Sequence, residues 1–173
     1  MLDPSRLEGY LRRLGLPRAE AGPQGLAAMA RAHAAAIPFE NIDAFLGRRV
    51  SLDPAAVFAK LVESGRGGWC FEQNLLLGEA LRAVGFGVTD LAARVLWGRG
   101  IDAVTPRTHR TLLVRAGDAE WPADVGFGGQ SIGGALRFDS TGEQQVGHDL
   151  YRLARDGAER LLSVRIRGEW LPM

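Results

Sequence analysis

The hydrophobic pattern of this chain changes its period once, between residues 85 and 87, and this change constrains the fold more than any other feature. Before it, apolar residues recur at helical spacing, as in the series Leu77, Leu81 and Val84. After it, apolar and polar residues alternate, as around Leu162 and Val164. A run of helices followed by a run of strands indicates an α+β fold. We therefore expect a helical part over residues 1–85 and a β part over residues 86–173.

Residues that begin and end helices divide the first half into four predicted helices. Asp3 can cap the first helix with Pro4 at its first position, and Gly15 can end it. Asp53 and Gly65 bracket the third helix in the same way. Residues 39–50 are predicted to form a packed loop. The predicted helices cover residues 4–14, 25–35, 54–64 and 70–84.

Alternating segments and turn residues divide the second half into strands. Gly117-Asp118 predicts a tight turn between two strands, and Asp156-Gly157 predicts another. Pro122 indicates an edge or an irregularity in its strand, because proline has no N–H to donate. The predicted strands cover residues 88–97, 107–115, 120–125, 135–139, 150–155 and 160–167.

Composition excludes several classes of protein. Hydrophobic residues make up 46% of the 173 residues and charged residues 24%, which is typical of a globular protein with a sizeable core. The formal net charge is +1, so we expect neither nucleic acid nor a membrane as a partner. No apolar run reaches the ~18 residues that span a bilayer. Of the 21 lysine and arginine residues only Lys60 is a lysine, which we interpret as a compositional bias.

Cys70 is the only cysteine, which excludes an intramolecular disulfide and a multi-cysteine metal site. A single thiol fits a reducing compartment, and residues 1–13 lack the pattern of a signal peptide, so we expect a cytoplasmic protein. Neither His33 nor His148 has cysteine partners at zinc-ligand spacing, and we predict no metal site. We expect His33 to pack or to face solvent at a helix end, and His148 to lie in a surface loop.

Cys70 follows Gly67-Gly68 and opens a helical segment, so its thiol belongs to the first turn of a predicted helix. Free backbone N–H groups and the positive end of the helix dipole favour a thiolate there. His109 and Asp124 follow it in the chain, and together the three are the parts of a cysteine nucleophile with an oriented base. Taken alone, each residue also has an ordinary structural interpretation. Cys70 could be a small buried hydrophobic residue, His109 a histidine of the core, and Asp124 the cap of a turn.

The predicted hairpin brings His109 and Asp124 together. If its turn centres on Gly117 and Asp118, residue 109 lies opposite about residue 126, and residue 124 lies opposite about residue 111. His109 and Asp124 are then diagonal neighbours on one face, roughly 7–8 Å apart between backbones, which their side chains can bridge. Contact with Cys70 is not local, because the start of its helix must dock on this face of the sheet.

Four motifs resemble, in this order, those of the arylamine N-acetyltransferase family over essentially the whole chain. They are Ile37-Pro38-Phe39-Glu40-Asn41-Ile42-Asp43, Arg66-Gly67-Gly68-Trp69-Cys70-Phe71-Glu72-Gln73-Asn74, Thr108-His109, and Asp124-Val125-Gly126-Phe127-Gly128-Gly129. The resemblance implies a helical bundle followed by an antiparallel β-barrel-like domain, with a Cys-His-Asp core like that of cysteine proteases. We expect the family's C-terminal lid domain to be absent from this chain, which predicts exposed apolar surface and self-association.

The resemblance also implies roles for single residues. Cys70 is implied to be the nucleophile, His109 its base, and Asp124 the residue that orients the histidine. The other implied site residues are Glu40 and Arg66, an ion pair that braces the site, and Phe39, Phe127 and Gly128, which bind substrate.

The implied activity is a ping-pong transfer of an acetyl group through a thioester on Cys70. The donor is acetyl-CoA, a substrate and not a permanently bound cofactor, and the acceptor is the nitrogen of a small arylamine, hydrazine or hydroxylamine. Residues 131–136 depart from the proline-containing loop of the family, which leaves the acceptor preference open. The alternatives are an amide synthase of the same fold that closes a macrolactam from a carrier-bound polyketide, a lid-less fragment with impaired catalysis, and a cysteine protease.

Overall fold

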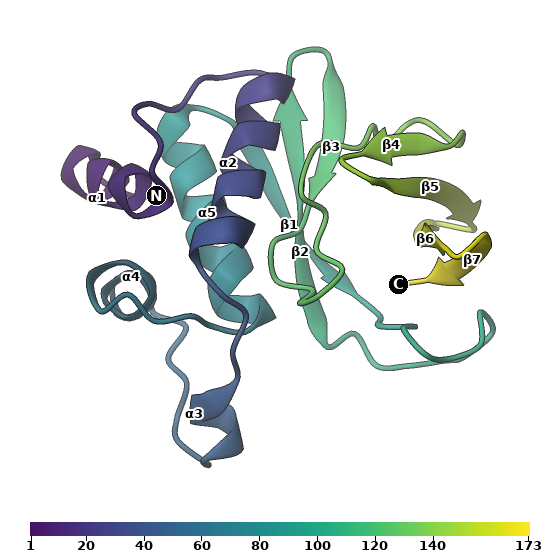
Figure 1. The fold of residues 1–173 in the computed structure, drawn as a ribbon, viewed down its shortest axis with the longest axis horizontal. Coiled ribbons are helices and arrows are strands. Elements are labelled where there is room, and N and C mark those ends of the chain that lie inside the picture. The colour runs from purple at the N-terminus through teal and green to yellow at the C-terminus, as the bar shows by residue number, and fades with distance from the viewer.

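The computed structural model describes residues 1–173 and has an α+β fold, with helices at one end and two antiparallel sheets at the other (Figure 1). The helices are α1 (Pro4–Leu14), α2 (Pro23–Ala36), α3 (Ile42–Phe45), α4 (Pro54–Phe58), the π-helix η1 (Ala59–Glu63) and α5 (Cys70–Val84). The strands are β1 (Gly87–Ala93), β2 (His109–Ala116), β3 (Ala119–Ala123), β4 (Gln144–Val146), β5 (Asp149–Asp156), β6 (Glu159–Ile166) and β7 (Glu169–Pro172). None of the helices combines the length and the apolar character needed to cross a membrane.

Helices α1 and α5 begin and end where the sequence predicts. Asp3 caps α1 by accepting a hydrogen bond from the N–H of Arg6 at 2.9 Å, and Pro4 is the first residue of the helix. α5 begins at Cys70 and ends before Gly85, whose backbone is left-handed with φ of 105°. The nucleophile candidate is therefore the first helical residue of α5.

The segment between α2 and α5 differs from the prediction in two places. The single helix predicted over residues 54–64 is divided into α4 and η1, because its last turn forms i→i+5 bonds, as from the Ser64 N–H to the Ala59 carbonyl at 2.8 Å. The loop over residues 39–50 contains the short helix α3, and it is not packed: Phe45 is 85% exposed. None of its side chains belongs to a hydrophobic core.

The strands form two separate sheets, so the expected β-barrel-like domain is not a closed barrel. One sheet has the order β1-β2-β3 and the other has the order β4-β5-β6-β7. Closure would require the edge strands to pair, and no ladder joins the two sheets. Pro122 lies in the edge strand β3, where its missing N–H leaves one donor fewer for a further strand.

The turn residues predicted the positions of the hairpins more accurately than the alternation of apolar and polar residues predicted the ends of the strands. Ala116 pairs with Ala119, and Asp156 pairs with Glu159, as the two predicted turns require. The strand predicted over residues 135–139 is absent, and β1 ends at Ala93 instead of residue 97. Strands β4 and β7 were not predicted, because three and four residues are too few to show alternation.

One hydrophobic core joins the helices to the first sheet. α5 packs against β1 and β2 on one side and against α1, α2 and α4 on the others (Figure 1). Leu77 and Leu81 of α5 and Leu112 of β2 are fully buried in this core. The second sheet has its own smaller core around Tyr151 and Val164. The packing of α5 on β2 fixes where the first residue of α5 lies relative to the β2–β3 hairpin.

Candidate active site

The β2–β3 hairpin places His109 in contact with Asp124. β2 begins at His109, and Asp124 directly follows β3. Leu112 pairs with Ala123, and the same register sets residue 111 opposite residue 124. Nε2 of His109 lies 2.5 Å from Oδ2 of Asp124, and both side chains are buried. The contact expected from the hairpin is confirmed.

The thiol of Cys70 faces the same imidazole. Asp124 occupies Nε2 of His109, so Nδ1 is the ring nitrogen that remains for the thiol. Burial by itself lowers the pKa of His109, but hydrogen bonds to Asp124 and Cys70, together with their negative charges, raise it to about 9. The imidazole is therefore positively charged at neutral pH. A charged imidazole beside a thiol favours the thiolate, the form of cysteine that reacts.

Asn74 fixes the carboxylate from α5, and the sequence analysis did not identify it. Its Nδ2 donates to Oδ1 of Asp124 at 3.0 Å and to the carbonyl of Arg110 at 2.6 Å. Its Oδ1 accepts from the N–H of Val125 at 3.0 Å. The fully buried amide thus ties α5 to β2 and to the segment that directly follows β3. Its position four residues after Cys70 was the available signal, because residues four apart share one face of a helix.

Gly126 lets the segment after β3 approach the nucleophile closely. Its N–H donates to Oδ1 of Asp124 at 2.9 Å. A Cβ at this position would lie 2.7 Å from Cα of Cys70 and 3.0 Å from Nδ2 of Asn74. Because a methyl group cannot occupy that space, any larger residue would push the hairpin away from α5.

A cavity of about 430 Å³ opens at the thiol. Cys70 and His109 line it together with Phe39 and Phe127, two of the three residues expected to bind substrate. The third, Gly128, belongs to the same loop but does not line the cavity. The cavity therefore joins the candidate nucleophile and base to two aromatic side chains.

An aromatic wall continues from the histidine to the cavity mouth. Phe127 lies edge-on to His109, with ring centroids 5.4 Å apart, and edge-on to Trp97 at 6.2 Å. Trp97 lies in the segment after β1 and is 39% exposed. The wall offers an apolar aromatic surface beside Cys70 and His109.

Glu40 and Arg66 form the predicted ion pair, with Nη2 of the arginine 2.7 Å from Oε1 of the glutamate. They belong to a larger charged cluster that was not predicted. Arg66 and Lys60 both contact Asp43 at 3.0 Å, and Lys60 contacts Glu72 at 2.9 Å. Hydrogen bonds from Lys60 and Arg66 lower the pKa of Asp43 to about 2. The cluster escaped the sequence analysis because its members come from separate segments that meet only in the tertiary structure.

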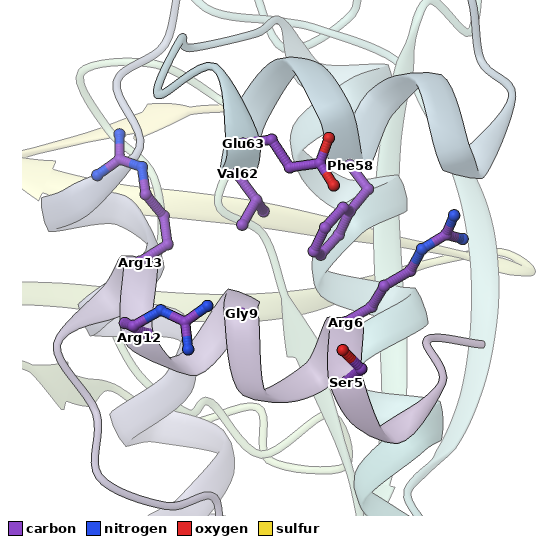
Figure 2. A pocket seen from close by; sticks show the side chains of 8 residues that line it. All are labelled: Ser5, Arg6, Gly9, Arg12, Arg13, Phe58, Val62 and Glu63. Carbon is purple, nitrogen blue, oxygen red and sulfur yellow. The ribbon is translucent and has the colours of Figure 1, made fainter.

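A second cavity, of about 470 Å³, lies between α1 and the α4–η1 segment (Figure 2). Arginine side chains of α1 line one side of it, and Phe58 and Val62 line the other. It is lined by no cysteine or histidine, so it lacks the thiol and imidazole that meet in the smaller cavity. The candidate active site is therefore the smaller cavity, which Cys70 and His109 line.

His33 packs inside the helical half, which is one of the two placements expected for it. Its Nδ1 lies 2.8 Å from the hydroxyl of Tyr10, and its Nε2 lies 2.6 Å from Oε1 of Gln73. Burial lowers its pKa to about 4, so it is neutral at physiological pH. His148 is exposed in the turn after β4, as expected. No group of three or more His, Cys, Asp or Glu side chains is arranged to hold a metal ion.

Residues 24–173 match the family model described as N-acetyltransferase. The arylamine N-acetyltransferase of Mycolicibacterium smegmatis is 45% identical over 174 residues, which cover 96% of this chain and 62% of that protein. The arylamine N-acetyltransferase / N-hydroxyarylamine O-acetyltransferase of Salmonella typhimurium is 42% identical and is matched over 98% of this chain and 60% of its own length. The chain thus spans 60–62% of the length of these curated relatives.

Solved structures show the same similarity in three dimensions. The arylamine N-acetyltransferase from Salmonella typhimurium matches with a TM-score of 0.93 and 41% identity, over 99% of this chain and 63% of that one. That of Mycobacterium marinum in complex with CoA matches with a TM-score of 0.91 and 36% identity, over 96% of this chain and 63% of that one. Motifs, family model and fold agree, and the chain belongs to the arylamine N-acetyltransferase family.

Proposed function

We propose that this chain carries the acetyl-transfer centre of an acetyl-CoA-dependent N-acetyltransferase. One observation carries the proposal: Cys70, at the start of α5, and His109, bonded to Asp124 at 2.5 Å, line the same cavity. A thiol beside an imidazole that is oriented by a carboxylate is the arrangement of a cysteine nucleophile with its base. The names of the relatives favour acetyl transfer over the amide synthase and the protease.

The first half-reaction loads the acetyl group. The thiolate of Cys70 attacks the carbonyl carbon of acetyl-CoA, and the tetrahedral intermediate collapses by breaking the bond to the CoA sulfur. The imidazolium of His109 gives its proton to that sulfur, so that CoA leaves as a thiol and an acetyl thioester remains on Cys70. Asp124 holds the imidazole through Nε2 and stabilises its charge.

The second half-reaction passes the acetyl group to an amine. The amine nitrogen attacks the thioester carbon, and neutral His109 removes the proton that the nitrogen loses. The carbon–sulfur bond to Cys70 then breaks, which releases the amide and restores the thiolate–imidazolium pair. Because CoA leaves before the amine reacts, the kinetics are ping-pong.

The oxyanion of both intermediates needs hydrogen-bond donors. The N–H of Cys70 is free of an intrahelical partner because it belongs to the first turn of α5. The N–H groups of Gly126 and Phe127 are already used, by Asp124 at 2.9 Å and by Oγ of Ser131 at 3.1 Å. We therefore assign the N–H of Cys70 as one donor.

The cavity favours a flat acceptor. Phe39 and the Phe127–Trp97 wall surround the thiol with aromatic surface, and aromatic rings pack well edge-to-face or offset against such walls. The acceptor class proposed is an arylamine or a hydrazine. This agrees with the arylamines named for the relatives, and the CoA bound in the Mycobacterium marinum structure supports acetyl-CoA as the donor.

Several large apolar side chains are exposed, and we propose that they promote self-association. Phe45, Ile101 and Val104 are 85%, 59% and 90% exposed; Phe45 ends the short helix α3, and the other two lie in the segment between β1 and β2. Large apolar side chains exposed to water favour contact between copies. Light scattering over a range of concentrations should show a rising mass, and a constant monomer mass would contradict this. We propose a cytoplasmic location because the thiol must stay reduced to react.

Intact-mass measurement after incubation with acetyl-CoA tests nucleophile and donor together. The wild type should gain the mass of one acetyl group, and addition of an arylamine should remove it. Cys70→Ala should gain nothing, whereas Gly133→Ala, at a position with open space around it, should gain the group as the wild type does. A wild type without the adduct, or a Cys70→Ala variant with it, would contradict the proposal.

A further inference from the structure

Lys60 is the only lysine among the 21 lysine and arginine residues of the chain. A bias toward arginine accounts for the others but not for the exception. The ammonium of lysine is a compact charge with three donors that can point to three separate acceptors, whereas the donors of the arginine guanidinium all lie in one plane. A single lysine at this position therefore suits a site where several acceptors surround one cation.

Three carboxylates from two segments surround this ammonium group. Nζ of Lys60 lies 2.9 and 3.1 Å from the two oxygens of Glu72, 3.0 Å from Asp43 and 3.7 Å from Glu40. Arg66 contacts the last two as well but not Glu72. Lys60 is thus the only cation that forms an ion pair with Glu72, which is 2% exposed.

The π-helix η1 holds Lys60 in this position. η1 buries Leu61 completely in the main core, while Lys60, one residue earlier, meets the carboxylates. Val62 and Glu63, on the other side of the turn, line the cavity against α1 (Figure 2). π-Helical turns are rare and occur frequently at functional sites. The irregular turn therefore anchors a charge that points toward the start of α5.

Glu72 connects this charge to the nucleophile. Its Oε2 accepts from the N–H of Trp69 at 3.2 Å, directly before Cys70. The backbone there approaches so closely that a Cβ on Gly68 would lie 2.8 Å from the same oxygen. An unpaired carboxylate held two residues from Cys70 would oppose a negative charge on sulfur.

We propose that Lys60 is a positioning residue for the Cys70 thiolate: it holds and neutralises Glu72 so that this carboxylate braces the start of α5 without repelling the nucleophile. The inference rests on the proposed function, in which Cys70 reacts as a thiolate. The other charged groups that face this thiol are His109 from β2 and Asp124 behind it, and neither contacts Lys60.

The test is the rate at which iodoacetamide alkylates Cys70, measured across pH without acetyl-CoA. Lys60→Met should move the midpoint of the profile upward by about one pH unit and slow alkylation about tenfold at neutral pH. The double variant Lys60→Met/Glu72→Gln, which removes both charges, should restore the profile. Arg48→Met is the matched control, because Arg48 contacts the same cluster through Asp43 at its exposed edge and does not reach Glu72.

Circular dichroism shows which variants are folded. If Lys60→Met does not fold, the single variant Glu72→Gln tests the inference. Removal of the Glu72 charge should move the alkylation profile to lower pH. The inference is overturned if the alkylation profile of folded Lys60→Met is unchanged, or if the double variant does not return to the wild-type profile. It is also overturned if the profile of Glu72→Gln is unchanged. A wild type whose thiol reacts no faster than that of a free cysteine would instead overturn the proposed function, so the two failures are distinguishable.

Discussion

Asp124→Asn isolates the charge that keeps His109 protonated. Asparagine has nearly the shape of aspartate and can still accept a hydrogen bond from Nε2, but it carries no charge. In the wild type, burial lowers the pKa of His109, and contacts with Asp124 and Cys70 raise it from 6.5 to about 9. Without the Asp124 charge, we expect burial to prevail and the pKa to fall to 6.5 or below. A change of about 2.5 pKa units corresponds to about 3 kcal/mol.

The same contact makes the stability of the wild type depend on pH. A histidine with a higher pKa in the folded chain than in the unfolded chain stabilises the fold fully below pH 6.5 and loses this effect as the pH rises through about 9. We expect this group to remove up to about 3 kcal/mol from the free energy of unfolding over that window. In Asp124→Asn, most of this dependence should disappear.

Two measurements check this prediction. Nuclear magnetic resonance of the imidazole C–H protons follows the titration of His109, and urea unfolding across the pH window gives the stability. Asp90→Asn is the matched control, because Asp90 lies on β1 and accepts from Arg82 and Arg110 at an exposed edge. This control should leave His109 unchanged. An Asp124→Asn variant whose His109 still titrates near pH 9 would refute the reasoning.

Three further predictions concern Asn74, Gly126 and His33. Asn74→Ala should lower the free energy of unfolding by about 2–4 kcal/mol in urea denaturation, because it leaves several buried partners unpaired, and it should slow acetylation in the intact-mass assay. Gly126→Ala should cost about 1–3 kcal/mol by overpacking and slow acetylation strongly, whereas Gly133→Ala, with nothing within 4 Å of its added Cβ, should change neither. His33 has a pKa lowered from 6.5 to about 4, so its contribution to stability is present above pH 6.5 and is lost as the pH falls through 4. In His33→Gln, the free energy of unfolding from urea denaturation should lose about 3 kcal/mol less between pH 6.5 and 4 than in the wild type. An unchanged loss would contradict the role assigned to His33.

Local rules predicted the elements that depend on neighbours in the chain. Asp3, Pro4 and Gly15 begin and end α1 because caps act within one turn. Gly117-Asp118 sets the register of the β2–β3 hairpin, and that register brings His109 to Asp124. Motif spacing was informative for the same reason, since each motif is a short contiguous segment.

The tertiary structure alone decided which distant segments meet. Nothing local brings α5 onto β2, so spacing places Asn74 on the same helix face as Cys70 but does not show that this face meets His109 and Asp124. The division of the β half into two open sheets is equally non-local, because strand pairing beyond a hairpin depends on packing. The sequence by itself determined a helix that starts at a thiol and a hairpin that joins a histidine to an aspartate. Only burial of one shared core brought the two together, because the burial of apolar side chains acts between segments however far apart they are in the chain.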